Sequence, residues 1–600
     1  MIRIPLRPLA KVLMAREDGR DPDLVEAHET VRRQSAVILS AKDQSRRRIL
    51  LLLISIMIAF SAIGIKMFSL ASLSVASPGH AQKISDSANS RQKITDRNGG
   101  VLATNIKTFS LYVHPQELID GERAAKDLQL IFPEQSSEKL LKLFSGSRKF
   151  AWIKKSISPE QMQMVKNLGE PGLKFGSREI RLYPNGRFAA HILGGTTFGD
   201  QGVNEAETNI VGEAGIERTF DNYLSKSENK ALALSIDIPV QSIIEKVLEN
   251  GIHVMNAKGG SAILMDANNG QVLALASLPD FDPNFRPRAP IKGDPSDSPL
   301  FNRAAQGLYE LGSTLKIFAA AQALDQNLAS VDTIINIKGP LSLGRFRVTD
   351  HHYLGKELSM SDVIVKSSNI GTARIAGMIG GSQQKNFFKK FGLLDVTGVE
   401  LPEASRAIPQ FPKRWSKVSS ATISYGHGIS ITPLHLASAY CAIVNGGRRV
   451  IPTLIKSNEG RASSSIISHE TSLELQKILK DVVKKGTAKS ANLIDYEIGG
   501  KTGTAEKVNF DKPGYIKDKV ITTFVAAFPI SQPEYVLVVT LDEPEDWSTD
   551  KPERTAGWTA VPVATEIVRR IAPVLGIKPG YMPTDKPLVS ASANFPLEEE

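Results

Sequence analysis

Residues 49–65 form an uncharged and mostly apolar run, which constrains this chain more than any other feature. The apolar character continues past Lys66 to about residue 71, and about 20 such residues are needed to cross the hydrocarbon core of a bilayer. Residues 1–48 carry 11 Lys and Arg against 7 Asp and Glu, and a positively charged flank stays in the cytoplasm. The sequence therefore predicts a cytoplasmic basic tail over 1–48 and one transmembrane anchor over 49–71.

A cleaved signal peptide is the alternative, with small residues near 76 or 81 as the cutting site. The 48-residue leader and an apolar core longer than ~7–15 residues favour an uncleaved anchor in the inner (cytoplasmic) membrane. No second run of this kind follows. We therefore expect everything beyond about residue 76 to lie in the periplasm or outside the cell.

Composition excludes several classes of protein. The chain has 600 residues, 42% hydrophobic and 23% charged, which is typical of folded domains and too long for one core. The net charge of +10 is spread along the chain, so no nucleic acid is expected as a partner. Cys441 is the only cysteine, lies among apolar residues and is predicted to be a packed core thiol. The ten histidines show no HExxH or paired-ligand spacing, which argues against a zinc enzyme.

Strand and helix patterns divide the remainder of the chain. Residues 77–225 alternate short strand-like runs with turns and predict a mixed α/β pedestal module for interactions. Residues 226–577 predict an α+β domain, with strands at both ends and a helical pattern over 311–500. Asn269-Gly270 between two apolar runs indicates a hairpin. Residues 578–600 are rich in Pro, Ser and Glu and are predicted to be disordered.

Ser313 and Lys316 stand at the start of an apolar, helix-forming stretch. Three residues make almost one helical turn, so the two side chains share a face. A serine becomes a nucleophile when a base removes its proton, and a lysine serves as that base when burial and a nearby cation keep it neutral. The Ser-x-x-Lys spacing alone is common in this chain, so its companions carry the assignment.

Two further motifs accompany this pair. Ser367-Ser368-Asn369 alone is compatible with a helix cap or a turn. Lys501-Thr502-Gly503-Thr504 occurs once, and we interpret Gly503 as a position that lets another extended backbone approach the sheet edge. Lys501 and the hydroxyls of Thr502 and Thr504 would then meet a carboxylate. The three motifs in this order, within one predicted domain, predict an acyl-transfer site.

This motif set is typical of β-lactamases and penicillin-binding proteins. Residues 91–577 resemble the class B penicillin-binding proteins, and the stretch 424–440 is more similar to the cell-division (FtsI-type) transpeptidases than to the elongation ones. Leu311 departs from the family, which commonly has Pro there. The resemblance implies a β-lactamase-like transpeptidase domain: a five-stranded antiparallel sheet with flanking helices and an all-helical subdomain. Other stretches that carry the likeness are ITDRNGGVLA, RLYPNGRFAAHILG, GEAGIERTFD, LALSIDIPVQ and ASLPDFDPN.

The resemblance also implies a role for each residue. Ser313 would attack the penultimate D-alanine of a peptidoglycan stem pentapeptide, and Lys316 would take its proton. Ser367 would relay a proton to the leaving amine, with Lys501 keeping Lys316 neutral, and Asn369 would hold the substrate amide. Thr502, Gly503 and Thr504 would bind the substrate and its terminal carboxylate, with the N–H groups of Ser313 and Thr504 as oxyanion hole. The acyl-transfer cycle that the resemblance implies needs no metal or organic cofactor.

Further implied partners are lipid-linked glycan strands, β-lactam antibiotics, a membrane glycan polymerase (FtsW-like) and other division proteins. Three alternatives remain: an elongation-type transpeptidase, a D,D-carboxypeptidase or β-lactamase-like hydrolase, and a catalytically silent sensor. A secreted hydrolase needs neither the anchor nor the long module before residue 226. A silent sensor is disfavoured because every motif residue is present.

Overall fold

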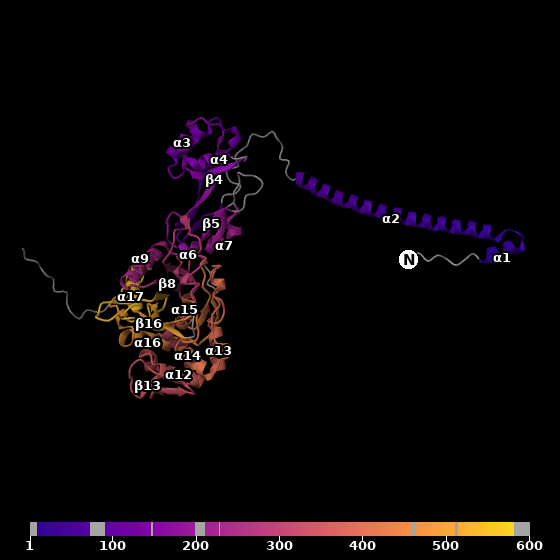
Figure 1. Cartoon of the computed structure of the whole chain (residues 1–600). Helices are drawn as coiled ribbons and strands as arrows, with labels where there is room; N and C mark the ends of the chain where they lie inside the picture. The colour runs from indigo at the N-terminus through magenta and orange to yellow at the C-terminus, as the bar shows by residue number, and fades with distance from the viewer. Residues whose placement is uncertain are drawn as a thin grey trace, which may run out of the picture. The chain divides into compact units, whose positions relative to one another are not determined.

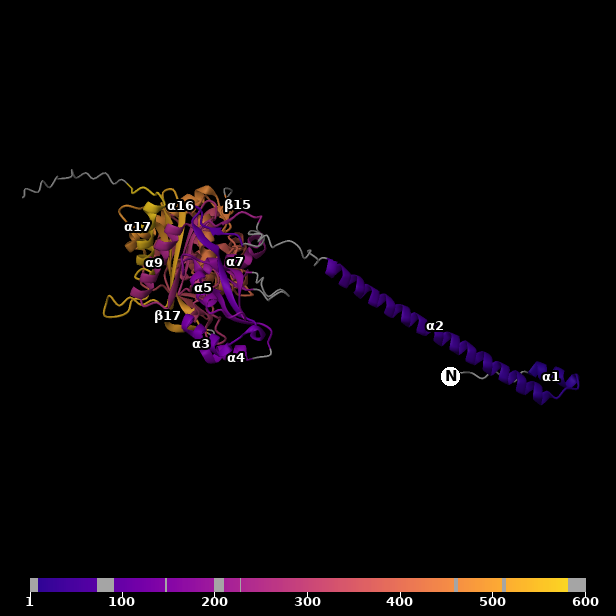
Figure 2. The ribbon, with the colours of Figure 1, turned by 90° about the horizontal axis from the view of Figure 1, so that it is seen from above.

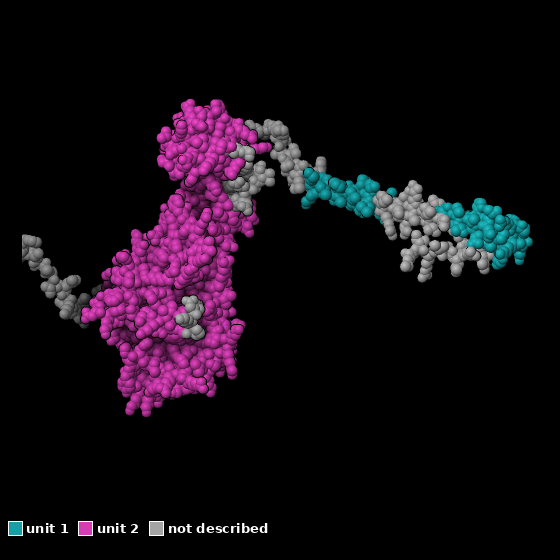
Figure 3. Space-filling view, viewed as in Figure 1, with its two compact units in different colours: residues 1–86 teal, residues 87–600 magenta. Residues whose placement is uncertain are grey.

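The computed structural model describes residues 9–72, 91–145, 148–198, 210–226, 228–457, 462–509 and 514–580. The chain forms two compact units, residues 1–86 and 87–600, coloured teal and magenta in Figure 3. The two cleavage positions considered above, the predicted pedestal start at 77–90 and the tail after residue 580 lie outside the described residues.

The first unit contains helices α1 (Leu9–Glu17) and α2 (Pro22–Ser72); Figure 1 shows α2 as a long rod, with the short α1 beside its N-terminal end. Within α2, Leu50–Met67 has a mean hydropathy of 2.3, and none of it is buried inside the protein. Eighteen helical residues span ~27 Å, close to the thickness of a hydrocarbon core. In the described part of the chain this is the one helix long and apolar enough to cross a membrane, at the place that the sequence predicts.

The pedestal is built on a five-stranded sheet that contains two long strands, β2 and β4. These two strands pair antiparallel along their length, and β1 pairs with β7 in parallel. Three helices and a separate apolar core cover part of this sheet. The elements are β1 (Ile94–Thr95), β2 (Val101–Val113), α3 (Gly121–Ile131), α4 (Ser137–Phe144), β3 (Ala151–Ile157), α5 (Pro159–Asn167), β4 (Leu173–Leu182), α6 (Ala190–Leu193), β5 (Gly195–Phe198), β6 (Ile210–Ala214), α7 (Gly215–Thr219), α8 (Asp221–Leu224) and β7 (Leu232–Ala233).

A buried ionic cluster fastens the base of the pedestal. The fully buried carboxylate of Glu217, in α7, accepts hydrogen bonds from Arg91 Nε and Arg181 Nε, each at 2.7 Å, and from Tyr183 OH at 3.2 Å. These four residues come from segments up to 126 positions apart. Since an unpaired buried charge costs roughly 3–5 kcal/mol, the cluster defines how these segments meet.

The second domain of this unit is organised by a five-stranded sheet in the order β16-β17-β18-β8-β9, with every neighbouring pair antiparallel. The predicted hairpin is confirmed between β8 and β9, and Gly270 in its turn has φ +77°. Helices α9 and α17 pack against each other and the sheet, and they lie side by side in Figures 1 and 2. The strands are β8 (Gly259–Asp266), β9 (Val272–Leu278), β16 (Gly499–Val508), β17 (Tyr515–Phe528) and β18 (Tyr535–Asp542), and the helices are α9 (Ile238–Val254) and α17 (Ala560–Val574).

Between residues 311 and 500 the regular structure consists mainly of helices, as predicted. The predicted all-helical subdomain also contains short two-stranded sheets. Their strands have three or four residues, which is too short to show an alternating apolar and polar pattern in the sequence. The helices are α10 (Lys316–Asp325), α11 (Met360–Val365), α12 (Asn369–Ile379), α13 (Gly381–Lys390), α14 (Lys417–Ser424), α15 (Pro433–Val444) and α16 (His469–Lys485), and the strands are β10 (Ile334–Asn336), β11 (Leu341–Leu343), β12 (Phe346–Val348), β13 (Glu357–Ser359), β14 (Arg448–Val450) and β15 (Ala462–Ser465).

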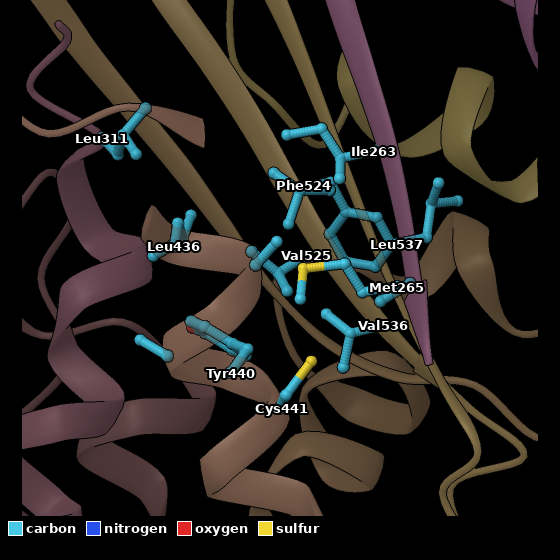
Figure 4. Close-up of a cluster of buried hydrophobic side chains, with 14 of the residues drawn as sticks. Ile263, Met265, Leu311, Leu436, Tyr440, Cys441, Phe524, Val525, Val536 and Leu537 are labelled. Atoms are coloured by element: carbon cyan, nitrogen blue, oxygen red, sulfur yellow. The ribbon is translucent and has the colours of Figure 1, made fainter. Parts of the chain in front are cut away.

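The core between the large sheet and α15 fixes the floor of the site. Figure 4 shows Val525 and Val536 of the sheet facing Tyr440 and Cys441 of α15. All four are fully buried, which confirms Cys441 as a core thiol. Tyr440 OH donates a hydrogen bond of 2.6 Å to the Thr314 carbonyl, so this core directly supports the turn that carries Ser313.

Candidate active site

Ser313 lies in a 3₁₀ turn, Gly312–Leu315, that leads directly into α10. The turn needs Gly312, whose φ of +56° is left-handed. It also packs against β16 so closely that a Cβ at Gly503 would lie 2.2 Å from the Leu311 carbonyl oxygen. Gly503 therefore admits the turn that carries Ser313, which differs from our interpretation that it admits an incoming backbone.

Lys316, one helical turn beyond Ser313, is fully buried. Its Nζ donates hydrogen bonds to the carbonyl oxygen of Ser367 and, at 3.1 Å, to Ser367 Oγ. Ser313 itself is half-buried, and its hydroxyl has no hydrogen-bond partner among the residues that the structure describes. The hydroxyl of Ser313 is thus free to react, and it belongs to the turn that places the buried amine of Lys316 three residues further on.

Ser367 links the two lysines of the sequence motifs. Lys501 Nζ donates to Ser367 Oγ at 3.1 Å, the same distance as Lys316 Nζ, and to the Thr502 carbonyl at 3.1 Å. Ser367 stands between α11 and α12 with φ +61°, a conformation that few residues with side chains adopt. Such backbone strain is characteristic of functional positions. The structure therefore brings Lys316, Ser367 and Lys501 together in one hydrogen-bonded chain.

Burial favours the neutral form of the lysine amines at this site. It lowers the pKa of Lys316 well below its ordinary value, and the Lys501 ammonium lowers that pKa further. The Asp350 carboxylate acts on Lys316 in the opposite direction. Burial also lowers the pKa of Lys501, to about 7. Lys316 consequently loses its proton more readily than an exposed lysine does, as a general base must.

Asp350 is a site residue that sequence reasoning misses. It accepts hydrogen bonds from Ser368 Oγ at 2.8 Å and from the backbone N–H groups of Asn369 and Ile370, at the N-terminus of α12. The Asn369 side chain donates to the Thr349 carbonyl at 3.0 Å. Asp350 thereby holds the Ser-Ser-Asn segment in place, but it belongs to no motif and lies far from Ser313 in the sequence, so no spacing indicates it.

The hydroxyl groups of Thr502 and Thr504, in β16, already take part in hydrogen bonds within the protein, and these bonds still leave hydroxyl protons for a ligand. Thr504 Oγ1 accepts from the Ala556 N–H at 3.0 Å, which leaves its proton free. Thr502 Oγ1 lies 2.6 Å from Thr487 Oγ1, and one proton of that pair is free. Strand β16 is an edge strand, since it pairs only with β17 in the sheet order. These features suit an extended peptide that ends in a carboxylate.

Two histidines face the same region. The His427 ring packs 5.4 Å from Tyr425 and 6.0 Å from Tyr515, and its pKa is lowered by burial and by Lys316. Burial and Lys316 also lower the pKa of His351. The aromatic packing of His427 is typical of a histidine with a structural role. Among the described residues, no three His, Cys, Asp or Glu side chains are grouped so as to hold a metal.

Comparison with known proteins defines the class. Residues 260–569 match the penicillin binding protein transpeptidase domain, and residues 87–232 match the penicillin-binding protein dimerisation domain. The chain is 33% identical to the Caulobacter vibrioides protein named "Probable peptidoglycan D,D-transpeptidase FtsI", over 83% of each chain. It is 28% identical to "Peptidoglycan D,D-transpeptidase FtsI" of Escherichia coli K12, over 84% of this chain and 86% of that one.

A solved structure supports the same fold. The apo form of penicillin binding protein 3 from Mycobacterium tuberculosis superposes with a TM-score of 0.62 at 24% identity, over 82% of this chain and 98% of that chain. The family matches and the identity to the curated relatives settle the class: the chain belongs to the penicillin-binding protein transpeptidase family, with the class B arrangement of a dimerisation domain before the transpeptidase domain.

Proposed function

We propose that this chain is a peptidoglycan D,D-transpeptidase of the cell-division type, with Ser313 as its acyl-carrying nucleophile. The observation that carries the site assignment is the position of Ser367 Oγ, 3.1 Å from both Lys316 Nζ and Lys501 Nζ, beside the turn of Ser313. The relatives named FtsI and the transpeptidase domain support the reaction and the class.

In the acylation half-reaction, Ser313 Oγ attacks the carbonyl carbon of the penultimate D-alanine while its proton passes to neutral Lys316. The oxyanion is held by the backbone N–H groups of Ser313 and Thr504, which the close packing of the Gly312 turn on β16 supports. The C–N bond then breaks. The proton moves from Lys316 through Ser367 Oγ to the leaving nitrogen, and D-alanine departs.

The donor peptide is held along the edge strand β16. Its backbone pairs with the strand, its terminal carboxylate accepts hydrogen bonds from Thr502 and Thr504, and Asn369 holds its amide on the opposite side. The free hydroxyl proton of Thr504, the one free proton of the Thr502–Thr487 pair and the open edge of β16 support this placement.

In the second half-reaction, the neutral side-chain amine of an acceptor stem peptide attacks the Ser313 ester and forms a new C–N bond. The C–O bond to Ser313 breaks, the proton that the amine loses returns to Ser313 Oγ, and a peptide cross-link results. A β-lactam acylates Ser313 in the same way, but its ring-opened amine stays tethered and blocks the acceptor. A structure of the Mycobacterium tuberculosis neighbour complexed with ampicillin shows the same drug class bound to this fold.

The membrane topology is part of the proposal. The basic tail over 1–48 lies in the cytoplasm, 49–71 crosses the inner membrane, and the pedestal (77–225) and transpeptidase domain (226–577) lie outside. The excess of Lys and Arg before the apolar helix supports this orientation. Lipid-linked glycan strands, an FtsW-like glycan polymerase and division proteins are the partners that such a location requires.

The reaction is tested with purified full-length protein in detergent and a synthetic stem pentapeptide plus an acceptor peptide. We expect release of D-alanine and formation of the cross-linked dimer, and neither product with Ser313→Ala. Release of D-alanine without dimer at saturating acceptor would indicate a hydrolase instead. Depletion in cells is expected to produce filaments, and round cells would indicate an elongation role.

A further inference from the structure

A short basic hairpin stands beside the Ser-Ser-Asn segment. Strands β11 and β12 pair antiparallel, with Arg345 in the connecting turn and Arg347 opposite Ser342. Val348 is buried in the main core, and Leu341 and Leu343 pack against that core. The apolar side chains thus fasten the hairpin to the domain. Arg345 and Arg347 are left exposed to solvent.

The cations of this segment form no ion pair with any residue that the structure describes. Residues 338–356 contain four Lys and Arg and a single acidic residue, Asp350, a net charge of +3 with neutral histidines. Asp350 is occupied by the N-terminus of α12. Among the described residues, none of the four cations forms an ion pair, whereas many other exposed Lys and Arg do; the four are Lys338, Arg345, Arg347 and Lys356.

The same segment reaches the catalytic centre. Asn369 Nδ2 donates to the Thr349 carbonyl, and the charge of Lys316 acts on His351. Arg347 is three residues from Asp350, which places it within ~10 Å along an extended chain. Tyr353, 84% exposed, lies on the far side of Asp350 in the sequence. The hairpin and the loop after it are therefore anchored beside Asn369, and their exposed side chains reach into solvent.

We propose that this basic hairpin, centred on Arg345 and Arg347, binds the carboxylates of the acceptor stem peptide and guides its amine to the Ser313 ester. This inference rests on the proposed function and adds the second substrate to it. Guanidinium groups bind carboxylates through paired hydrogen bonds, and an exposed aromatic ring such as Tyr353 adds an apolar contact.

The acceptor fits this surface better than the donor does. The donor pairs with the edge of β16 and meets the Ser-Ser-Asn segment only through the Asn369 side chain. The acceptor has to approach the ester without displacing the donor, and the basic segment provides cations next to Asn369 and Asp350 that the donor does not use. A stem peptide bears free carboxylates along its length, so its charge complements a surface of unpaired cations.

The test uses full-length protein in detergent, a fixed donor pentapeptide and an acceptor stem peptide with free carboxylates. Arg345→Glu combined with Arg347→Glu is expected to raise the KM for this acceptor about tenfold, since two favourable charge contacts become repulsive. Arg347→Gln is expected to raise it about threefold. An acceptor whose carboxylates are converted to amides should bind wild type weakly and distinguish little between wild type and variants.

The matched control is Lys139→Glu with Lys142→Glu, which makes the same charge change on the exposed face of α4 in the pedestal. It should leave the acceptor KM unchanged. Acylation by a fluorescent penicillin should proceed at the wild-type rate in every variant, which also verifies folding. An unchanged acceptor KM in the hairpin variants overturns the inference, as does slowed acylation confined to them, because the hairpin would then serve the donor. Absence of labelling in the wild type would instead refute the proposed function itself.

Discussion

Replacing the buried amine of Lys501 tests the electrostatics of the site through stability. Lys501→Met keeps a side chain of similar length and removes the ionisable group. In the folded protein burial lowers the pKa of Lys501 to about 7, whereas in the unfolded chain the amine keeps its ordinary value of about 10.4. The folded state thus binds fewer protons than the unfolded state. Stability is therefore lost as pH falls from about 10 towards 7.

The size of the effect follows from the difference between the folded and unfolded pKa of Lys501. Burial of this amine lowers the free energy of unfolding by about 4 kcal/mol at pH 7 and by about 2 kcal/mol at pH 9. The methionine also loses the hydrogen bonds to Ser367 Oγ and the Thr502 carbonyl, each worth ~1 kcal/mol. Lys501→Met should therefore stabilise the domain by about 2 kcal/mol at pH 7 and by about zero at pH 9. For a domain of this size the first figure corresponds to a Tm increase of about 3 °C.

Thermal unfolding of the full-length protein in detergent, at pH 7 and pH 9, measures both values. The same variant should acylate with penicillin more slowly. The acidic limb of its rate should move to higher pH, because loss of a neighbouring cation raises the pKa of Lys316. A Tm below that of wild type at pH 7, or a stabilisation that grows towards pH 9, would refute the reasoning.

Two further substitutions test the chain of groups around Lys316. Ser367→Ala removes the hydroxyl that accepts a hydrogen bond from both lysines. We expect the rate of penicillin acylation, measured by stopped flow, to fall by ~10²–10³-fold with little change in Tm. A fall of less than threefold would exclude a proton relay through Ser367. Asp350→Asn removes the carboxylate that raises the pKa of Lys316, so the acidic limb of the acylation rate should move to lower pH. A shift of that limb to higher pH would contradict the assignment of Lys316 as base.

The large sheet and the helices around it were predictable because their signals are local. Asn269-Gly270 between two apolar runs indicates the β8–β9 hairpin, and the runs ending at Phe528 and Leu541 indicate β17 and β18. The beginning of β17 was not predictable. Tyr515–Lys519 is exposed and polar, and it becomes strand only through its pairing with Lys507 and Val508 of β16.

The catalytic groups likewise divide into those that are close in the sequence, which were predictable as a pair, and those that only the fold brings together. Ser313 and Lys316 share one helical turn, so their spacing in the sequence already indicates a pair. Lys501 joins them through Ser367, a contact across 134 residues that only the fold creates. Asp350 was missed because a single carboxylate in a polar loop has no periodicity and no motif. Its role exists only because β12 places it at the N-terminus of α12.

The role of Gly503 also needed the fold. A glycine within a strand indicates that something approaches closely, but the sequence does not tell what. In the structure that neighbour is the Leu311 carbonyl of the nucleophile turn. Leu311 itself is buried, and its carbonyl accepts a hydrogen bond from Thr314 Oγ1 at 2.8 Å.

The most direct measurement is the site of covalent attachment of a penicillin to the full-length protein, mapped by mass spectrometry of its peptides. The account predicts one long-lived adduct on Ser313, lost in Ser313→Ala while the Tm is unchanged. An adduct on any other residue, or an adduct of undiminished yield in Ser313→Ala, would contradict the assignment of Ser313 as the nucleophile.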